Sequence, residues 1–391
     1  MTVTNLDGFD ALCTGCLSCV NVCPKNAIGK QTREDGFCYP QIDEALCVNC
    51  GLCVKACPIS ETHKENNDIK GIYRAYSKDE TVRANGSSGG VFEHLANSFL
   101  ASDGVVFGVA FSRDKLAYHT STNEVPLKSL LRSKYIQSDI GNSYREVGEQ
   151  LLSGNRVLFS GTPCQVRGLK KYLSAKHIDD VLLTTADFYC HGVPSPAYFR
   201  EGIERMEAEE GKKIVDVTFR EKDRGWRKQV TNFYFDDNTK KQIVSSPYYY
   251  YYYFLNNYTL RDVCYGCEEY HTHCSDITVA DCWGVEKSRD DDKGISLLVI
   301  HSEKGEQAFG SILEQLCVEQ VDVKAFNNRV YSHEKYDRSR KEKWCSVYKA
   351  RGEAYVSTVF FKKQRRKNTL RTRAVQCLGI AKGVVKKFFK K

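Results

Sequence analysis

Two copies of one cysteine pattern near the start of the chain constrain its fold more than any other feature. Residues 13–24 and 47–58 each read C-x2-C-x2-C-x3-C-P. This run is typical of bacterial ferredoxin domains with two 4Fe–4S clusters, in which the fourth cysteine of each run binds the cluster of the other run. The spacing therefore predicts one 4Fe–4S cluster bound by Cys13, Cys16, Cys19 and Cys57, and a second bound by Cys47, Cys50, Cys53 and Cys23.

Zinc binding and a disulfide framework are the alternatives for such a cysteine-rich segment. Structural zinc sites take four ligands that come in pairs, whereas each run here holds three cysteines close together and a fourth at an offset. The whole run occurs twice, and both copies end in proline. This repetition favours iron–sulfur clusters over both alternatives.

The composition indicates a globular protein of the reducing cell interior. The chain has 391 residues, of which 41% are hydrophobic, so two or three domains and a large core are expected. No apolar run approaches the roughly 18 residues of a membrane-spanning helix. Residues 1–10 lack the basic and apolar regions of a signal peptide. Because cluster-forming thiolates need a reducing environment, we expect a cytoplasmic protein.

The positive charge of the chain is concentrated at its end. Twelve of the 57 basic residues lie in residues 362–391, which contain no acid, so the rest of the chain carries 45 basic and 49 acidic residues. This distribution argues against a nucleic-acid-binding protein. The apolar residues of this segment fall on one face of a helix, which predicts a basic amphipathic tail over 360–391. Such a helix lies on an anionic membrane surface, here the inner face of the cell membrane; the alternative is a helix packed on its own protein.

A loop rich in serine and glycine follows the ferredoxin-like runs. Residues 86–90 read Gly-Ser-Ser-Gly-Gly and precede an apolar pattern of helical spacing. Small residues let backbone N–H groups approach a ligand, and a helix N-terminus favours an anion. The loop is therefore either an anion-binding loop or an ordinary glycine-rich turn.

Two predicted strands each end close to a cysteine. Residues 156–160 lead into Cys164, and residues 181–188 lead into Cys190. The carboxyl ends of strands in an open α/β sheet meet at one edge, where ligands bind. We therefore expect these two cysteines at the same sheet edge.

A third group of cysteines lies further along the chain. Cys264 and Cys267 form a C-x2-C pair, and Cys274 follows. Such a pair can hold zinc, with His271 or His273 as a further ligand, act as a redox dithiol, or contribute to an iron–sulfur cluster. The spacing alone leaves these three possibilities open.

Six motifs occur in order along the chain: Ser87–Gly90, Gly161–Gln165, Cys190–Ser195, Thr218–Arg220, Cys264-x-x-Cys267, and Asp276 to Gly284. Taken together, they resemble the coenzyme F420 hydrogenase/dehydrogenase beta-subunit family, in a bacterial branch with a fused two-cluster ferredoxin domain. The resemblance covers roughly residues 70–345.

The resemblance implies FAD and a third 4Fe–4S cluster. The cluster ligands would be Cys164, Cys190, Cys264 and Cys267, with Cys274 as a replacement for one of the first two. Residues matching the segments that line the flavin are Ser87, Ser88, Gly89, Gly90, Lys134, Tyr135, Gln137 and Thr162. Catalytic candidates are Lys134, which would stabilise negative charge on reduced flavin, and His191 and Lys222 as proton donors; the last two are equally suited to structural hydrogen bonding.

These features predict an α+β fold in four parts. They are a ferredoxin-like domain (1–62), a mixed α/β flavin-binding domain in two parts (71–150, and 151–345 with the third iron–sulfur site), and a C-terminal amphipathic helix within the tail (360–391).

The predicted function is that of an iron–sulfur flavoprotein oxidoreductase. Electrons would pass from a redox partner, such as ferredoxin or another oxidoreductase, through the three clusters to FAD, and then to an organic two-electron acceptor. The basic tail suggests lipid-linked substrates, such as the sugar carriers of surface-polysaccharide assembly. One alternative is an electron-transfer subunit that feeds a partner enzyme. Another is a ferredoxin fused to a zinc-containing binding module.

Overall fold

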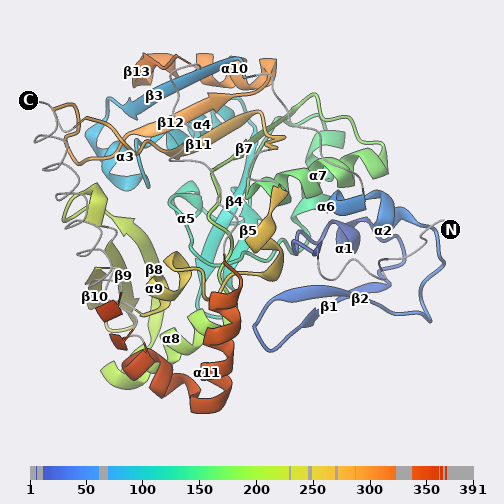
Figure 1. Cartoon of the computed structure of the whole chain (residues 1–391). Helices are drawn as coiled ribbons and strands as arrows, with labels where there is room; N and C mark the ends of the chain where they lie inside the picture. Colours follow the sequence, from blue (N-terminus) through green and yellow to red (C-terminus); the bar gives the residue numbers. More distant parts are fainter. Residues whose placement is uncertain are drawn as a thin grey trace, which may run out of the picture.

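The computed structural model describes residue 6 and residues 12–60, 69–228, 230–244, 249–268, 272–286, 288–322, 337–360, 362–363 and 366–367. It shows a small ferredoxin-like unit beside a large mixed sheet, with a second sheet on the far side (Figure 1). The predicted α+β fold is confirmed for these parts. The predicted amphipathic tail lies almost entirely outside the described residues.

The ferredoxin-like unit consists of short helices and one hairpin. Its elements are α1 (Ser18–Val22), β1 (Ile28–Thr32), β2 (Cys38–Ile42), α2 (Leu52–Lys55) and η2 (Pro58–Ser60). The two strands pair antiparallel, with Ile28 opposite Ile42. The hairpin therefore separates the two cysteine runs along the chain.

The large sheet has eight strands in the order β13-β3-β12-β11-β7-β6-β4-β5. Its middle strands β11, β7, β6 and β4 are parallel, and the strands on both sides pair antiparallel. The bounds are β3 (Gly71–Ser77), β4 (Val105–Ser112), β5 (Leu116–Ser121), β6 (Val157–Ser160), β7 (Leu183–Asp187), β11 (Ile277–Asp281), β12 (Ser296–Ile300) and β13 (Leu316–Gln320).

Helices cover both faces of this sheet, as the alternation of side chains along a strand requires. Phe107 and Phe159 pack in one core with α6 and α7, whereas Val106 and Leu158 pack in another with α4 and α10. The helices are α3 (Glu80–Asn85), α4 (Val91–Leu100), α5 (Leu127–Leu130), α6 (Ser143–Leu152), α7 (Pro163–Lys176) and α10 (Glu303–Gly310), followed by η6 (Leu313–Gln315).

The second sheet is a three-stranded antiparallel meander in the order β10-β9-β8. Phe219 and Phe233 on this sheet pack in a core that also contains Tyr250, Tyr253 and Trp344. The elements around this core are α8 (Pro196–Glu210), β8 (Ile214–Glu221), η3 (Trp226–Lys228), β9 (Val230–Phe235), β10 (Lys240–Val244), α9 (Tyr249–Leu255), η4 (Asp262–Gly266), α11 (Ser339–Tyr355) and η8 (Val356–Phe360).

The ferredoxin-like unit shares a core with the large sheet. Leu17 and Val22 of α1 are buried in one apolar cluster with Tyr144 of α6 and Leu169 of α7. The Arg145 guanidinium donates to the carbonyl oxygens of Asn21, at 2.7 Å, and Val20, at 3.1 Å. Apolar contact and the Arg145 hydrogen bonds together fix the position of the ferredoxin-like unit on the sheet.

No described helix is both long enough and apolar enough to cross a membrane.

Candidate functional site

The first set of predicted cluster ligands lies together in the ferredoxin-like unit. Burial, together with the neighbouring thiols of Cys57 and Cys13, raises the pKa of the Cys16 thiol to about 12. Burial likewise raises the pKa of Cys19, with Cys16, Cys13 and Cys57 adding to the effect. Thiols gathered in this way resist ionisation unless a cation compensates, which the irons of a cluster would do.

The second set lies at a more exposed position. Burial raises the pKa of Cys53, and Cys50 and Cys47 raise it further. Cys23 and Cys53 pack against the same small apolar cluster. Cys50 is exposed to solvent, in contrast to the buried Cys16.

The backbone of the two runs curls in the same way. The residues two and four positions after the first cysteine of each run have positive φ: 72° at Gly15 and 56° at Leu17, then 52° at Asn49 and 72° at Gly51. Such left-handed residues within a turn direct successive N–H groups inward, a concavity found in many iron–sulfur sites. Both runs therefore fit a cluster, and the cost of left-handed backbone at Leu17 and Asn49 is consistent with a functional constraint.

The third set gathers at the edge predicted for Cys164 and Cys190. Strands β6 and β7 pair in parallel, so their carboxyl ends meet. Burial raises the pKa of Cys164, with Cys267 and Cys190 adding to it. Burial also raises the pKa of Cys190, with Cys264 and Cys267 adding to it. The four cysteines attributed to a third cluster are thus neighbours in space.

Polar groups of the fold contact two of these thiols. The Gly192 amide donates to Cys190 Sγ at 3.4 Å, and Thr162 Oγ1 lies 3.1 Å from Cys164 Sγ. Donors to sulfur are among the features that set the potential of a cluster. Thr162, which the family resemblance assigns to flavin binding, therefore contacts the third cysteine set in this structure.

Helix α7 brings the first and third cysteine sets side by side. Gly168 lies one turn after Cys164, and a Cβ atom at this glycine would be 3.0 Å from both Cβ and Sγ of Cys16. Cys16 also contributes to the raised pKa of Cys164. The absence of a side chain at Gly168 is what lets the ferredoxin-like unit approach this helix so closely.

The serine and glycine loop joins β3, β12 and the N-terminus of α4. Ser88 Oγ donates to the Ile295 carbonyl at 2.7 Å, and the Gly89 amide donates to Ser296 Oγ at 2.9 Å. A Cβ at Gly89 would be 2.4 Å from the Ala75 carbonyl oxygen, so only glycine fits. Gly90 has φ 81° and is the N-cap of α4. Packing therefore accounts for the two glycines, and the helix N-terminus beside them favours an anion.

A basic side chain just after β8 and an aromatic side chain of η3 contact this loop. Lys222 Nζ donates to the carbonyls of Ser88 and Arg83, and burial followed by nearby Arg83 and Arg220 lowers its pKa to about 7. The Trp226 indole N–H donates to the Ser87 carbonyl at 3.1 Å.

Arg220 is buried beside the same loop and pairs with Asp281 at 2.9 Å. Its Nη1 donates to the Tyr135 hydroxyl at 3.4 Å, so Tyr135 and Ser87 belong to one site. Within the described structure, Arg220 Nε is buried without a hydrogen-bond partner. The sequence places Arg220 in a family motif but does not predict it as a site residue. Its position at the turn between two predicted strands, close to Lys222, could have indicated that it belongs to the site.

The two other catalytic candidates are held by contacts within the fold. Lys134 Nζ donates to the carbonyls of Ser129, at 2.9 Å, and Leu131, at 2.5 Å, and burial lowers its pKa to about 7. The His191 ring packs edge-on against Phe254 at 5.0 Å, and burial lowers its pKa. A catalytic role for either remains a prediction.

Gln137 contacts the ferredoxin-like unit. Its Nε2 donates to the Thr14 carbonyl at 3.0 Å, and its Oε1 accepts from Arg261 at 3.0 Å. In this structure its amide therefore faces the loop of the first cysteine run, although the family resemblance assigns it to the flavin.

The zinc alternative gains no support from the described residues. His273 Nδ1 lies 2.8 Å from Asp187 Oδ2 in a buried pair, and His271 falls outside the described chain. Over the residues that were placed, no three His, Cys, Asp or Glu side chains converge as they would on one metal ion. A 4Fe–4S cluster does not require such convergence, because each of its cysteines binds a different iron.

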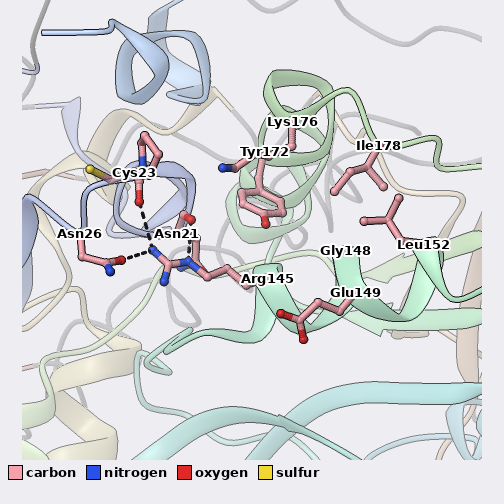
Figure 2. Close-up of a pocket in the computed structure, with 11 residues that line it drawn as sticks. Asn21, Cys23, Asn26, Arg145, Gly148, Glu149, Leu152, Tyr172, Lys176 and Ile178 are labelled. Atoms are coloured by element: carbon pink, nitrogen blue, oxygen red, sulfur yellow. Dashed lines mark hydrogen bonds between the residues drawn. The ribbon is translucent and has the colours of Figure 1, made fainter. Parts of the chain in front are cut away.

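A polar cleft of about 290 Å³ opens beside Cys23, at the junction of the ferredoxin-like unit with α6 and α7 (Figure 2). Arg145 crosses it and donates to Asn26 Oδ1 at 2.9 Å. The cleft brings solvent close to a predicted ligand of the second cluster.

Comparison with known proteins supports the same two parts of the chain. Residues 154–325 match the family model for the C-terminal part of the beta subunit of coenzyme F420 hydrogenase/dehydrogenase, and residues 12–60 match the model of a 4Fe–4S dicluster domain. The predicted family resemblance is thereby confirmed. No curated protein matches the chain.

A solved structure described as a xenon derivatisation of the F420-reducing [NiFe] hydrogenase complex from Methanosarcina barkeri contains a similar chain. The identity is 14%, the match covers 74% of this chain and 95% of the other, and the TM-score is 0.47.

Proposed function

Because this chain joins a 4Fe–4S dicluster domain to a beta-subunit region of the coenzyme F420 hydrogenase/dehydrogenase family, we propose that it is an iron–sulfur flavoprotein oxidoreductase. It would carry electrons from a one-electron donor protein to FAD and on to an organic acceptor that takes two electrons. The coarser description, an iron–sulfur electron-transfer protein similar to such beta subunits, is the premise of the proposal.

One observation carries the proposal: the first and third cysteine sets meet across helix α7. Cys16 packs on Gly168, one turn from Cys164, so clusters on the two sets would be neighbours. The exposed Cys50 of the second set lies on the side open to a donor. We infer that electrons enter at the second cluster, pass to the first, and reach the third.

The residues around the serine and glycine loop fit FAD. The N-terminus of α4 favours the pyrophosphate, and Arg220, whose buried Nε has no hydrogen-bond partner among the described residues, would supply positive charge beside the loop. FAD, when bound, would couple the single electrons of the clusters to two-electron chemistry. Tyr135 would border the site through its contact with Arg220.

The metal and flavin content of the purified protein tests this function directly. Protein purified without oxygen should contain about 12 iron atoms and one FAD per chain, because three 4Fe–4S clusters hold four irons each. Iron, zinc and released flavin are measured on the same sample. Zinc together with about eight irons and no flavin would refute both the third cluster and the flavin.

A second assay addresses the acceptor. If the chain has its own acceptor site, the isolated protein should pass electrons from reduced ferredoxin to a small two-electron acceptor. Full iron and flavin content without any such reduction would instead identify a subunit that feeds a partner enzyme.

We also propose that the basic tail binds an anionic membrane surface, where lipid-linked substrates would be within reach. A chain that ends after Lys363 should lose sedimentation with vesicles containing anionic lipid. The cut leaves Phe360 in place because that residue is buried against Tyr253 and Tyr258. Vesicles of neutral lipid are the control. Equal sedimentation of the full-length and the shortened chain with the anionic vesicles would contradict the proposal.

A further inference from the structure

Arg261 is a fully buried cation at the junction of the ferredoxin-like unit and the large domain. Its Nε donates to the Cys13 carbonyl at 2.7 Å, its Nη2 donates to the Cys38 carbonyl at 3.0 Å, and Nη2 also lies 3.6 Å from Cys13 Sγ. The guanidinium packs 4.2 Å from the centre of the Tyr39 ring. One side chain thus contacts the backbone and the thiol of the first cysteine run.

The surroundings hold this side chain in one orientation. Gln137 Oε1 accepts from its Nη1 at 3.0 Å, while Gln137 Nε2 donates to the Thr14 carbonyl. Gly15, with φ 72°, makes room for it, because a Cβ there would be 2.7 Å from Arg261 Nη1. The Arg261 amide donates to the Val193 carbonyl at 3.0 Å. Gly15 of the ferredoxin-like unit therefore leaves the space that the Arg261 side chain fills, and Gln137 of the large domain holds its guanidinium by a hydrogen bond.

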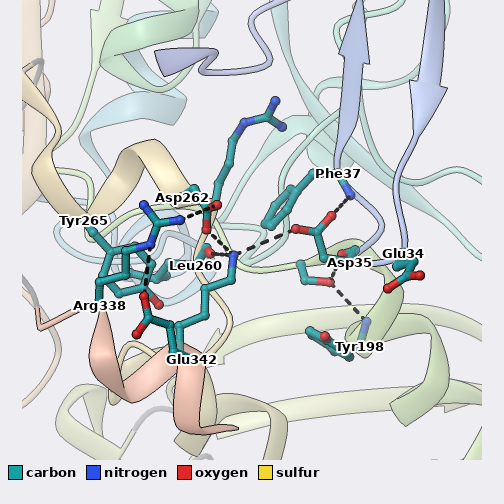
Figure 3. Close-up of polar contacts among 12 residues, drawn as sticks. Glu34, Asp35, Phe37, Tyr198, Leu260, Asp262, Tyr265, Arg338 and Glu342 are labelled. Carbon is teal, nitrogen blue, oxygen red and sulfur yellow. Dashed lines mark hydrogen bonds and ion pairs between the residues drawn. The ribbon is translucent and has the colours of Figure 1, made fainter. Parts of the chain in front are cut away.

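The carboxylate next to Arg261 pairs with other cations. Asp262 accepts from Lys341 at 2.6 Å and from Arg338 at 3.0 Å, both from the segment around α11 (Figure 3). Among the described residues, none of the ion pairs joins a carboxylate to Arg261 within 4.0 Å. A buried cation of this kind needs a compensating negative charge, which a cluster bound by four thiolates would supply.

Arg261 is also linked to the third cysteine set. It directly precedes η4, which carries Cys264. One short backbone segment therefore connects the side chain that contacts the first cysteine run with a cysteine of the third set. At the position that corresponds to Gly15, the second run carries Asn49, so the glycine that makes room for Arg261 occurs only in the first run.

We propose that Arg261 is a positioning residue for electron transfer, and that it raises the reduction potential of the cluster bound by Cys13, Cys16, Cys19 and Cys57. Reduction adds one electron, delivered by the one-electron donor protein, and so one negative charge. A fixed cation and N–H donors near the sulfurs stabilise that charge. The first cluster would then attract electrons from the exposed second cluster. The direction of flow rests on the proposed function, whereas the effect on potential rests only on the dicluster domain.

The test is a redox titration of the reduced clusters followed by low-temperature EPR, on the full chain. In Arg261→Gln, the reduction potential of one ferredoxin-type cluster should become more negative by about 59 mV, which corresponds to about tenfold in the one-electron equilibrium constant. The reduction potential of the other ferredoxin-type cluster should stay unchanged. Arg261→Lys keeps the charge and should recover part of the shift, because lysine cannot reproduce the forked hydrogen bonds.

Arg145→Gln is the matched control. Arg145 donates to ferredoxin carbonyls, including that of Cys23 beside the second cluster, but has no hydrogen bond to a cluster sulfur among the described contacts, so the potential that shifts in Arg261→Gln should stay unchanged. An unchanged pair of potentials in Arg261→Gln, or an equal shift in the control, overturns the proposal. If Arg261→Gln loses iron, Gln137→Leu decides instead. It should give a smaller shift in the same direction, and no shift overturns the proposal.

The iron count of the same samples keeps the two proposals apart. About eight irons with the predicted shift would refute the third cluster and leave the role of Arg261 standing.

Discussion

The Cys164→Ser variant is expected to lose about four irons per chain while the two ferredoxin-type clusters remain, because this thiol is proposed as a ligand of the third cluster only. Transfer of electrons to the organic acceptor should fall to the background rate, since the path from Cys16 to the flavin site would be cut. Reduction of the ferredoxin-type clusters by a chemical reductant should be unchanged. Iron analysis, EPR and the acceptor assay measure the three quantities.

Cys317→Ser is the matched control for this experiment. Cys317 lies on strand β13, at one edge of the large sheet, and belongs to none of the three predicted sets. The Cys317→Ser variant should keep its full iron content and its activity with the organic acceptor. If Cys164→Ser kept the full iron content, Cys274 would become the fourth ligand to test next, and the assignment of Cys164 would be wrong.

The Gly168→Ala variant should be less stable than the natural protein by about 1–3 kcal/mol, the usual cost of overpacking a filled site. The added methyl would be 2.9 Å from the Tyr144 hydroxyl and 3.0 Å from Cys16. Replacing glycine by alanine inside a helix normally stabilises a protein by about 0.5–1 kcal/mol. A loss of stability in Gly168→Ala would therefore indicate the close contact with Cys16 and Tyr144. Electron transfer between the ferredoxin-like unit and the third cluster should also slow, because α1 must move away from α7.

The control is Gly310→Ala in helix α10, where a Cβ would meet nothing within 4 Å. It should be neutral or stabilising in denaturant unfolding of the anaerobic protein. Gly168→Ala behaving like Gly310→Ala would show that Cys16 does not pack against α7 as described.

The features that could be predicted from the sequence are those set by local spacing. The two cysteine runs specify their own loops, and the meeting of Cys164 with Cys190 follows from the general geometry of parallel strands. The Gly89 and Gly90 positions were also recognisable, although packing against Ala75 explains Gly89 as fully as any ligand would.

What could not be predicted depends on contacts between distant segments. Arg261 follows Cys13 by 248 positions, and no local pattern distinguishes it from a surface arginine. Gln137 faces Thr14 instead of the serine and glycine loop because the ferredoxin-like unit packs on the large domain at that point. Likewise, Gly168 reads as an ordinary helix glycine until Cys16 is placed against it.

The unequal exposure of the two ferredoxin-type sites has a consequence for damage by oxygen. Cys50 is open to solvent, whereas Cys16 is buried against α7. Because oxidation of a cysteine depends on its exposure, air would attack the outer cluster first. On the proposed path of electrons, the chain would then lose its connection to the donor while the first cluster stayed intact. The outer cluster would therefore be the part that oxygen inactivates first, and rebuilding that cluster alone would restore electron transfer.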